Sequence, residues 1–199
     1  MTDQGAVPNY QENEGESRPQ WRYIFGWVAR SGAGESRLLT GWMGLAASEV
    51  GLTRLLLPSP SLTELLRELQ PAPSWRLSWT PLLRRSYWQV RAYLSGHLKE
   101  FSIPLDLGHV SGFQARVLGA AQSVGWGETC SYGELAEAVG SAEASRAVGQ
   151  ALASNPVALV VPCHRIVGSD GGMVGFGGGV EQKLALLGLE GVTVAGESV

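Results

Sequence analysis

Three apolar runs dominate the first third of the chain. Aromatic and β-branched residues fill positions 21–29, and further apolar runs occupy 41–47 and 52–57 on either side of the polar segment 48–51. Such residues fit the pleated, half-buried surface of a sheet. The pattern therefore predicts three strands, the last two joined as a hairpin.

Two helices with leucine-rich faces follow these strands. Ser61, with Glu64 three residues later, has the spacing of a capping box, and Thr80 before Pro81 is typical of a second helix start. The apolar faces are Leu62, Leu65, Leu66 and Leu69 in the first helix, and Leu83, Tyr87, Val90 and Leu94 in the second. Strands with packed helices predict a small α/β or α+β domain over residues 20–100. Nothing in this segment indicates an active site.

The second half of the chain begins with an extended segment. Pro104 disfavours helix, so residues 101–110 are predicted to link two domains. Ser111 and Gln114 then predict a capped helix that runs to about residue 124. Residues 158–161 form an apolar run that predicts a buried strand, and a last helix is expected over residues 180–189. The pattern predicts a mainly helical domain over residues 111–199.

Residues 131–154 have the pattern of a helix-turn-helix. Ser131 with Glu134 predicts one short helix, and Ser141 predicts the start of a second that ends near residue 154. The inner face of the second helix is Ala144, Ala147, Val148, Ala151 and Leu152, and its outer face is Ser145, Gly149 and Ala153. Arg146 is the only long side chain on that outer face. By periodicity alone, ordinary helix packing with a solvated Arg146 is favoured over close approach to a narrow DNA groove.

Charge limits how the chain could bind nucleic acid. The net charge is -3, distributed as -3 over residues 1–19, +4 over residues 20–107 and -4 over residues 108–199. The last segment therefore lacks a broad basic surface, and its affinity for undamaged DNA should be weak. The polar, acidic segment 1–19 predicts a disordered tail.

Cellular location is predicted from what the chain lacks. No stretch is long and apolar enough to span a bilayer, and residues 1–19 lack the apolar core of a secretory signal. With only Cys130 and Cys163, a structural disulfide is not expected. We therefore expect a cytoplasmic protein with no membrane partner.

Cys163 is the residue that suggests chemistry. It stands between Pro162 and His164 at the end of the apolar run. A cysteine in such a place is most often a small buried hydrophobe, but an adjacent histidine adds a base. Adjacent side chains point apart, so a water would have to bridge thiol and imidazole, and Glu190 is a candidate to orient the base. Each residue also has a simpler interpretation, His164 as a core histidine and Glu190 as a surface carboxylate.

Two other ligand sites are weighed and set aside. The five histidine and cysteine residues lack the paired spacing of zinc ligands, so no metal is predicted. Residues 168–179 contain seven glycines, but they do not sit between a strand and a helix of a βαβ unit, as a phosphate-binding loop requires. These glycines could instead offer backbone N–H groups and room for a flat ligand.

The segment Pro162-Cys163-His164-Arg165-Ile166 resembles the active-site signature of the O6-alkylguanine-DNA alkyltransferases. The resemblance extends over about residues 101–192 and includes 127–136, 146–149, Asn155-Pro156, Lys183 and 189–191. It implies an RNase H-like N-terminal domain, a C-terminal domain with a helix-turn-helix, and no cofactor. It also implies a monomer that binds double-stranded DNA containing alkylated guanine through the minor groove.

The resemblance also implies roles for single residues. Cys163 would accept the alkyl group from O6-alkylguanine irreversibly and once per molecule, with O4-alkylthymine as a second candidate substrate. His164 would take the thiol proton through water, Glu190 would orient His164, Asn155 would hold the turn, and Tyr132 would donate a proton to the leaving guanine. The base must leave the stack, since its O6 is out of reach within it.

DNA contacts and a base pocket are implied in the same way. Arg146 would fill the gap left by the flipped nucleotide, and the other implied DNA-binding residues are Ser131, Ala144, Ser145, Ala147 and Gly149. The implied pocket residues are Val161, Ala158, Phe176 and Gly177. Phe176 stands where many members of the family have tyrosine, and Ala158 stands where some have proline. The wall of the pocket should therefore differ from that of those members. The alternatives are a protein that binds alkylated DNA without transfer, and a cysteine hydrolase, which the Cys-His adjacency disfavours.

Overall fold

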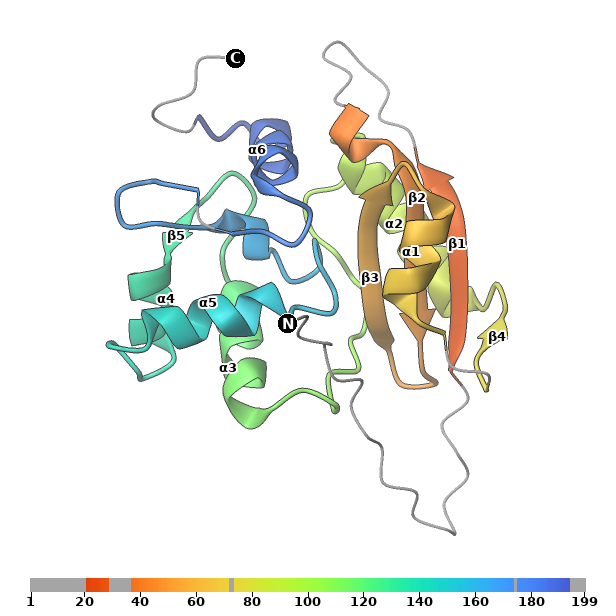
Figure 1. Cartoon of the computed structure of the whole chain (residues 1–199), viewed down its shortest axis with the longest axis horizontal. Coiled ribbons are helices and arrows are strands. Elements are labelled where there is room, and N and C mark those ends of the chain that lie inside the picture. The colour runs from red at the N-terminus through yellow and green to blue at the C-terminus, as the bar shows by residue number, and fades with distance from the viewer. Residues whose placement is uncertain (1–20, 29–36, 72–73, 174, 194–199) are drawn as a thin grey trace, which may run out of the picture.

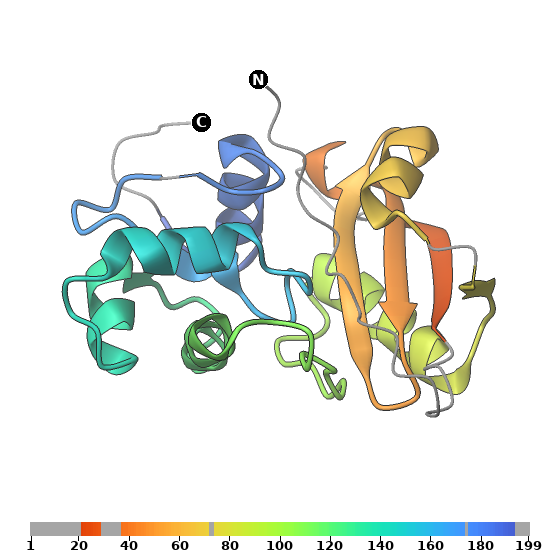
Figure 2. The ribbon, with the colours of Figure 1, turned by 60° about the horizontal axis from the view of Figure 1, so that its bottom comes forward.

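The computed structural model describes residues 21–28, 37–71, 74–173 and 175–193. A sheet with two helices forms one half of the molecule and a group of four helices forms the other, and the two lie side by side in both ribbon views (Figures 1 and 2). The mixed α/β prediction is confirmed. The expected tail at residues 1–19 lies outside the described residues.

A four-stranded sheet organises the first half. Its order is β3-β2-β1-β4, with β1 antiparallel to β2, β2 antiparallel to β3, and β4 parallel to β1. The turn between β2 and β3 is closed by a 3.0 Å hydrogen bond from the Ser48 amide to the Gly51 carbonyl. The strands are β1 (Arg22–Val28), β2 (Gly41–Ala47), β3 (Leu52–Ser59) and β4 (Arg76–Leu77).

One helix covers each face of this sheet (Figure 1). Helix α1 (Leu62–Leu69) begins where Ser61 accepts a hydrogen bond from the Glu64 amide, and α2 (Pro81–Leu94) begins where Thr80 caps it in the same way. The four residues predicted for the inner face of α2 are all buried. On α1 only Leu65 and Leu69 are buried, and this helix packs against β2 and β3.

The second half is mainly helical. Its helices are α3 (Gly112–Ala121), α4 (Tyr132–Ala138), α5 (Ser145–Ala153) and α6 (Val180–Leu189). The predicted capping box of Ser131 and Glu134 is complete, with each side chain bonded to the other's backbone N–H. A short parallel pair joins β5 (Cys130–Ser131) to β6 (Ile166–Val167). The 3-10 turns are η1 (Arg37–Leu39) and η2 (Cys163–Arg165).

Two predictions for this half are wrong. Helix α5 begins at Ser145 rather than after Ser141, because the Ala144 amide bonds to the Ser141 carbonyl at 2.8 Å and closes a turn there. A capping box from Ser141 would need Glu or Gln at position 144, where the chain has alanine. Residues 158–161 form a tight turn instead of a strand, with Leu159 in the left-handed region at φ 69°. The run is apolar because the turn is packed into the interior.

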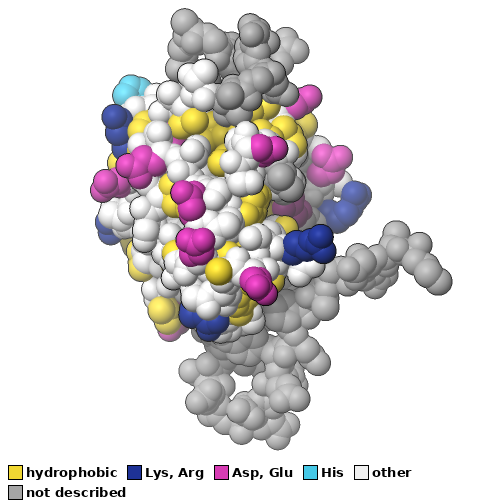
Figure 3. Space-filling view, turned by 90° about the vertical axis from the view of Figure 1, so that its left-hand side faces the viewer, with side chains coloured by type: hydrophobic (Ala, Val, Ile, Leu, Met, Phe, Trp, Pro, Cys, Tyr) yellow, Lys and Arg dark blue, Asp and Glu magenta, His cyan; other side chains and the backbone are white. Residues whose placement is uncertain are grey.

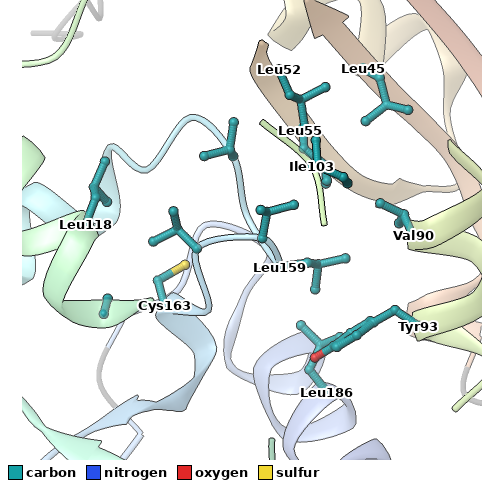
Figure 4. Close-up of a cluster of buried hydrophobic side chains, with 14 of the residues drawn as sticks. Leu45, Leu52, Leu55, Val90, Tyr93, Ile103, Leu118, Leu159, Cys163 and Leu186 are labelled. Carbon is teal, nitrogen blue, oxygen red and sulfur yellow. The ribbon is translucent and has the colours of Figure 1, made fainter. Parts of the chain in front are cut away.

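A single hydrophobic core spans both halves. Leu55 of β3 and Val90 of α2 lie in the same cluster as Leu159 and Leu186 of the helical half (Figure 4). The segment expected to be a linker also packs on the sheet, because the Leu52 amide donates to the Pro104 carbonyl at 2.8 Å. The two halves are therefore held together by core packing as well as by the chain. In the described part of the chain no helix has the length and apolarity to cross a membrane.

Candidate active site

Cys163 lies at the first residue of η2, where Pro162 ends the tight turn. Its side chain is almost covered, at 9% exposure. The Asn155 side-chain amide donates to Sγ at 3.2 Å and to the Val161 carbonyl at 2.9 Å, and its oxygen accepts from the Val157 amide at 3.0 Å. One side chain thus bridges the start of the turn, its end and the sulfur.

The environment keeps the sulfur protonated at rest. Burial raises the pKa of the Cys163 thiol, and the hydrogen bond from Asn155 and the charge of Lys183 only partly oppose this effect. A neutral thiol is a poor nucleophile. Reaction at Cys163 therefore requires a base that removes its proton when the substrate is in place.

His164 and Glu190 form a buried pair behind the cysteine. Nε2 of His164 lies 2.9 Å from Oε1 of Glu190, and neither side chain is exposed. Arg165 donates to the same carboxylate, from Nε to Oε2 and from Nη2 to Oε1, each at 2.9 Å. Burial alone would raise the pKa of Glu190, but the hydrogen bonds from His164 and Arg165 lower it to about 2. The carboxyl is therefore ionised at neutral pH.

This carboxylate determines where the imidazole carries its proton. An ionised carboxylate only accepts hydrogen bonds, so Nε2 of His164 must be the protonated nitrogen. Burial lowers the pKa of His164, which leaves the ring neutral. Its other nitrogen, Nδ1, then has a lone pair, is buried, and bonds to no protein atom among the described residues. His164 is thus a neutral base whose basic nitrogen is not joined directly to the thiol.

Tyr93, from the sheet-containing half, completes this cluster. Its hydroxyl donates to Oε1 of Glu190 and lies 3.1 Å from Nε2 of His164. The expectation that residues 20–100 contribute nothing to an active site is therefore wrong. No local pattern could have identified Tyr93, because its polar partners are 71 and 97 residues away in the sequence.

Lys183 is a second residue whose position the sequence did not predict. Its side chain is fully buried, and Nζ donates to the Ile166 carbonyl. Nζ also lies 5.8 Å from the centre of the Tyr132 ring. Burial lowers the pKa of Lys183, and the nearby Cys163 sulfur opposes that change. Burial has the opposite effect on an acid and raises the pKa of Tyr132, so Tyr132 is a neutral phenol at neutral pH.

A cleft of about 550 Å³ leads to the sulfur. Its lining includes Cys163, Asn155, Ala158, Phe176 and Gly177. The opposite wall comes from β3, η1 and the residue after β3, and includes Leu38, Leu55, Leu56, Leu57, Pro58 and Pro60. Three of the four predicted pocket residues line the cleft. Val161, the fourth, is fully buried beneath it and is not in its lining, because its side chain packs into the core.

The helix-turn-helix presents Arg146 to solvent at the first turn of α5. On the outer face predicted for the second helix, Ser145 and Gly149 are of intermediate exposure and Ala153 is exposed. The other residues implied to contact DNA, Ser131, Ala144 and Ala147, are also of intermediate exposure. A Cβ atom at Gly149 would lie 3.8 Å from the Tyr132 ring, which is an ordinary van der Waals distance, so the packing of α5 on Tyr132 does not itself require glycine there. The end of the molecule formed around α4 carries scattered carboxylates and few basic groups (Figure 3), as the segment charge predicts.

Comparisons with known proteins identify the family to which the chain is similar. Residues 112–192 match the family model of the 6-O-methylguanine DNA methyltransferase DNA-binding domain. The methylated-DNA–protein-cysteine methyltransferase of Mycolicibacterium paratuberculosis is 46% identical over 146 residues, which cover 72% of this chain and 88% of that protein. The enzyme of the same name from Haemophilus influenzae is 37% identical over 148 residues, with 72% and 82% covered.

Solved structures extend the likeness to both halves of the molecule. The crystal structure of Mycobacterium tuberculosis OGT in complex with DNA is 36% identical, with a TM-score of 0.67 over 85% of this chain and 92% of that one. The O6-methylguanine-DNA methyltransferase of Pyrococcus kodakaraensis is 26% identical, with a TM-score of 0.66 over 85% and 99%. This chain therefore belongs to the methylated-DNA–protein-cysteine methyltransferase family.

Proposed function

We propose that this protein repairs DNA by moving the alkyl group of O6-alkylguanine to the sulfur of Cys163, once per molecule. The observation that carries the proposal is the position of Cys163, which lines the cleft while Asn155 holds its sulfur and the His164–Glu190 pair lies behind it. A resident base supports transfer over binding alone. The thioether product has no group that would release the alkyl chain, so the reaction is stoichiometric.

The transfer is a displacement at carbon. The thiol proton passes through a bridging water to Nδ1 of His164, and Glu190 stabilises the imidazolium that forms. The sulfur then forms a bond to the alkyl carbon as the bond between that carbon and guanine O6 breaks. Guanine leaves with the electron pair of that bond.

Tyr132 and Lys183 assist the leaving group. The Tyr132 phenol supplies a proton to the departing guanine, and the buried ammonium of Lys183, 5.8 Å from the ring, stabilises the negative charge left behind. The imidazolium proton later returns to Tyr132 through solvent, so protons balance. No metal or other cofactor is needed in this sequence of steps.

Double-stranded DNA delivers the base through the minor groove. Arg146 is the long, exposed side chain at the start of α5, where it can enter the stack and replace an extruded nucleotide. The flipped guanine then enters the cleft between Ala158, Phe176 and Gly177 on one side and β3 on the other. The DNA complex of the Mycobacterium tuberculosis relative supports DNA as the partner.

Intact-protein mass spectrometry tests the proposal. After incubation with an excess of duplex that contains O6-methylguanine, the protein should gain the mass of one methylene, and peptide mapping should place it on Cys163. The Cys163→Ala variant should gain nothing, and Cys130→Ala should react like the wild type. Tight binding with unchanged mass would show instead a protein that senses the damage without repairing it.

A further inference from the structure

Four donors converge on the carboxylate of Glu190, and one comes from the other half of the molecule. Tyr93 of α2, His164 and Arg165 of η2, and the Gly127 amide all bond to it. Three of these donors belong to the helical half that contains Cys163. Tyr93 alone reaches across the core.

Counting protons assigns a direction to each contact. The Tyr93 hydroxyl has one proton, which goes to Oε1 of Glu190, so only its lone pairs face Nε2 of His164 at 3.1 Å. Nε2 thus meets two acceptors, the carboxylate at 2.9 Å and the phenol oxygen. Both require that Nε2 carry the ring proton. The phenol therefore reinforces the tautomer that the carboxylate imposes, in which Nδ1 is the bare, basic nitrogen.

We propose that Tyr93 is a positioning residue for alkyl transfer, through which the sheet-containing half of the molecule controls the proton of His164. Its hydroxyl holds the Glu190 carboxylate and accepts from Nε2, so Nδ1 remains free to take the thiol proton. This inference rests on the proposed function, because it assigns Tyr93 a part in the same reaction.

The surroundings of Tyr93 favour a fixed hydroxyl. Its ring is fully buried, with ring centres 5.0 Å from Phe101 and 5.1 Å from Trp126. Burial first, and then the neighbouring Glu190, raise the pKa of Tyr93 far above its ordinary value, so it remains a donor throughout the physiological range. A residue that served only for packing would need no hydroxyl here.

Removing the hydroxyl has a defined effect on His164. The charged and titratable groups around the imidazole are Glu190, Arg165, Lys183 and Tyr93. A donor to a carboxylate disperses its charge, so Tyr93→Phe leaves Glu190 a stronger partner for an imidazolium. His164 should then protonate at a higher pH than in the wild type, and a larger fraction would be unable to act as a base near neutrality.

Histidine NMR reads this out without any alkyl transfer. The chain has three histidines, so a ¹⁵N-histidine sample gives few signals, and His164→Gln identifies the buried one. We expect the Nε2–H tautomer in the wild type and a titration midpoint at higher pH in Tyr93→Phe. The signals of His97 and His109 report whether that variant is folded. An unchanged midpoint in Tyr93→Phe, or an Nδ1–H tautomer in the wild type, would overturn the proposal.

Tyr87→Phe is the matched control. Tyr87 lies on the same helix, is buried, and its hydroxyl donates to the Trp27 carbonyl at 2.7 Å, away from Glu190. Tyr87→Phe loses the hydrogen bond to Trp27, and Tyr93→Phe loses those to Glu190 and His164, so both should lower the melting temperature. Only Tyr93→Phe should move the His164 titration, and an equal shift in Tyr87→Phe would refute the assigned role.

Single-turnover repair completes the test. At neutral pH, Tyr93→Phe should transfer the methyl group from O6-methylguanine duplex about tenfold more slowly, the scale of one hydrogen bond to a charged group, and the acid limb of its rate profile should move to higher pH. Tyr87→Phe should keep the wild-type rate and profile. If the wild type transfers nothing, the proposed function fails, while the NMR titration still decides whether Tyr93 sets the state of His164.

Discussion

Replacing Glu190 by glutamine tests the buried cluster through its dependence on pH. The substitution keeps the shape of the side chain but removes the charge that Arg165 and His164 share. Arg165 would then be a buried cation without its anion, which is the costly way to break a buried ion pair. We therefore expect Glu190→Gln to be less stable than the wild type at pH 7.

The magnitude follows from the change in pKa. The pKa of Glu190 falls from 4.5 to about 2 on folding, and at about 1.4 kcal/mol per unit this corresponds to about 3 kcal/mol of stability at pH 7. A carboxyl with a depressed folded-state pKa stabilises the protein fully above its unfolded pKa. That contribution is lost as pH falls from 4.5 toward 2, and about 1.5 kcal/mol should remain at pH 3.

Urea unfolding at a series of pH values measures this. The free-energy difference between wild type and Glu190→Gln should shrink as pH falls from 4.5 toward 2, which is the range set by the two pKa values. His164 also gains protons in acid, so the comparison is repeated in a His164→Gln background. Glu181→Gln, at an exposed position of α6, is the control and should track the wild type. A constant difference across this pH range would refute the assigned electrostatics.

Three further substitutions test the turn, the DNA contact and the cleft. Asn155→Ala should cost about 1–3 kcal/mol in urea unfolding, because it frees the Val161 carbonyl, and should slow single-turnover repair; wild-type stability would contradict this. Arg146→Ala should slow the repair of duplex DNA more than the reaction with free O6-methylguanine. Replacing Arg116, which is exposed on α3, by alanine should change neither rate. Equal losses on both substrates in Arg146→Ala would exclude an intercalating role. Ala158→Pro adds apolar surface to the cleft wall and should raise the rate for O6-benzylguanine relative to O6-methylguanine; an unchanged ratio would place the benzyl group elsewhere.

Helix starts were predictable because their causes are local. At Ser61, Thr80 and Ser131 the side chain that caps the helix accepts a hydrogen bond from the backbone amide three residues later. The exception, Ser141, shows what such a pattern leaves out. A serine side chain can accept a hydrogen bond from an amide of the first helical turn only if a helix begins at that serine. Here the Ser141 carbonyl accepts from the Ala144 amide instead and closes a separate turn before the helix.

The candidate site was predictable only in part, for a related reason. Cys163, His164 and Glu190 stand in a recognisable motif, and the structure brings them together with Asn155. The apolar run before Cys163 predicts a strand, and this prediction is wrong because a buried turn and a buried strand can have the same apolar amino-acid composition. Tyr93 occupies a buried position on α2 that any apolar ring would satisfy. Only the fold shows that its hydroxyl meets a carboxylate.

The resting state of this site suits a residue that reacts once. A thiolate–imidazolium pair would react with many electrophiles and oxidants, and an irreversible reagent could not recover from such losses. Here burial keeps Cys163 a thiol, and the basic nitrogen of His164 is not bonded to it. Under the proposed mechanism, the thiol loses its proton only when an alkyl carbon lies against the sulfur and the departing guanine can accept a proton. The same burial that makes Cys163 a weak nucleophile in the free protein therefore restricts its reaction to the base that the cleft admits.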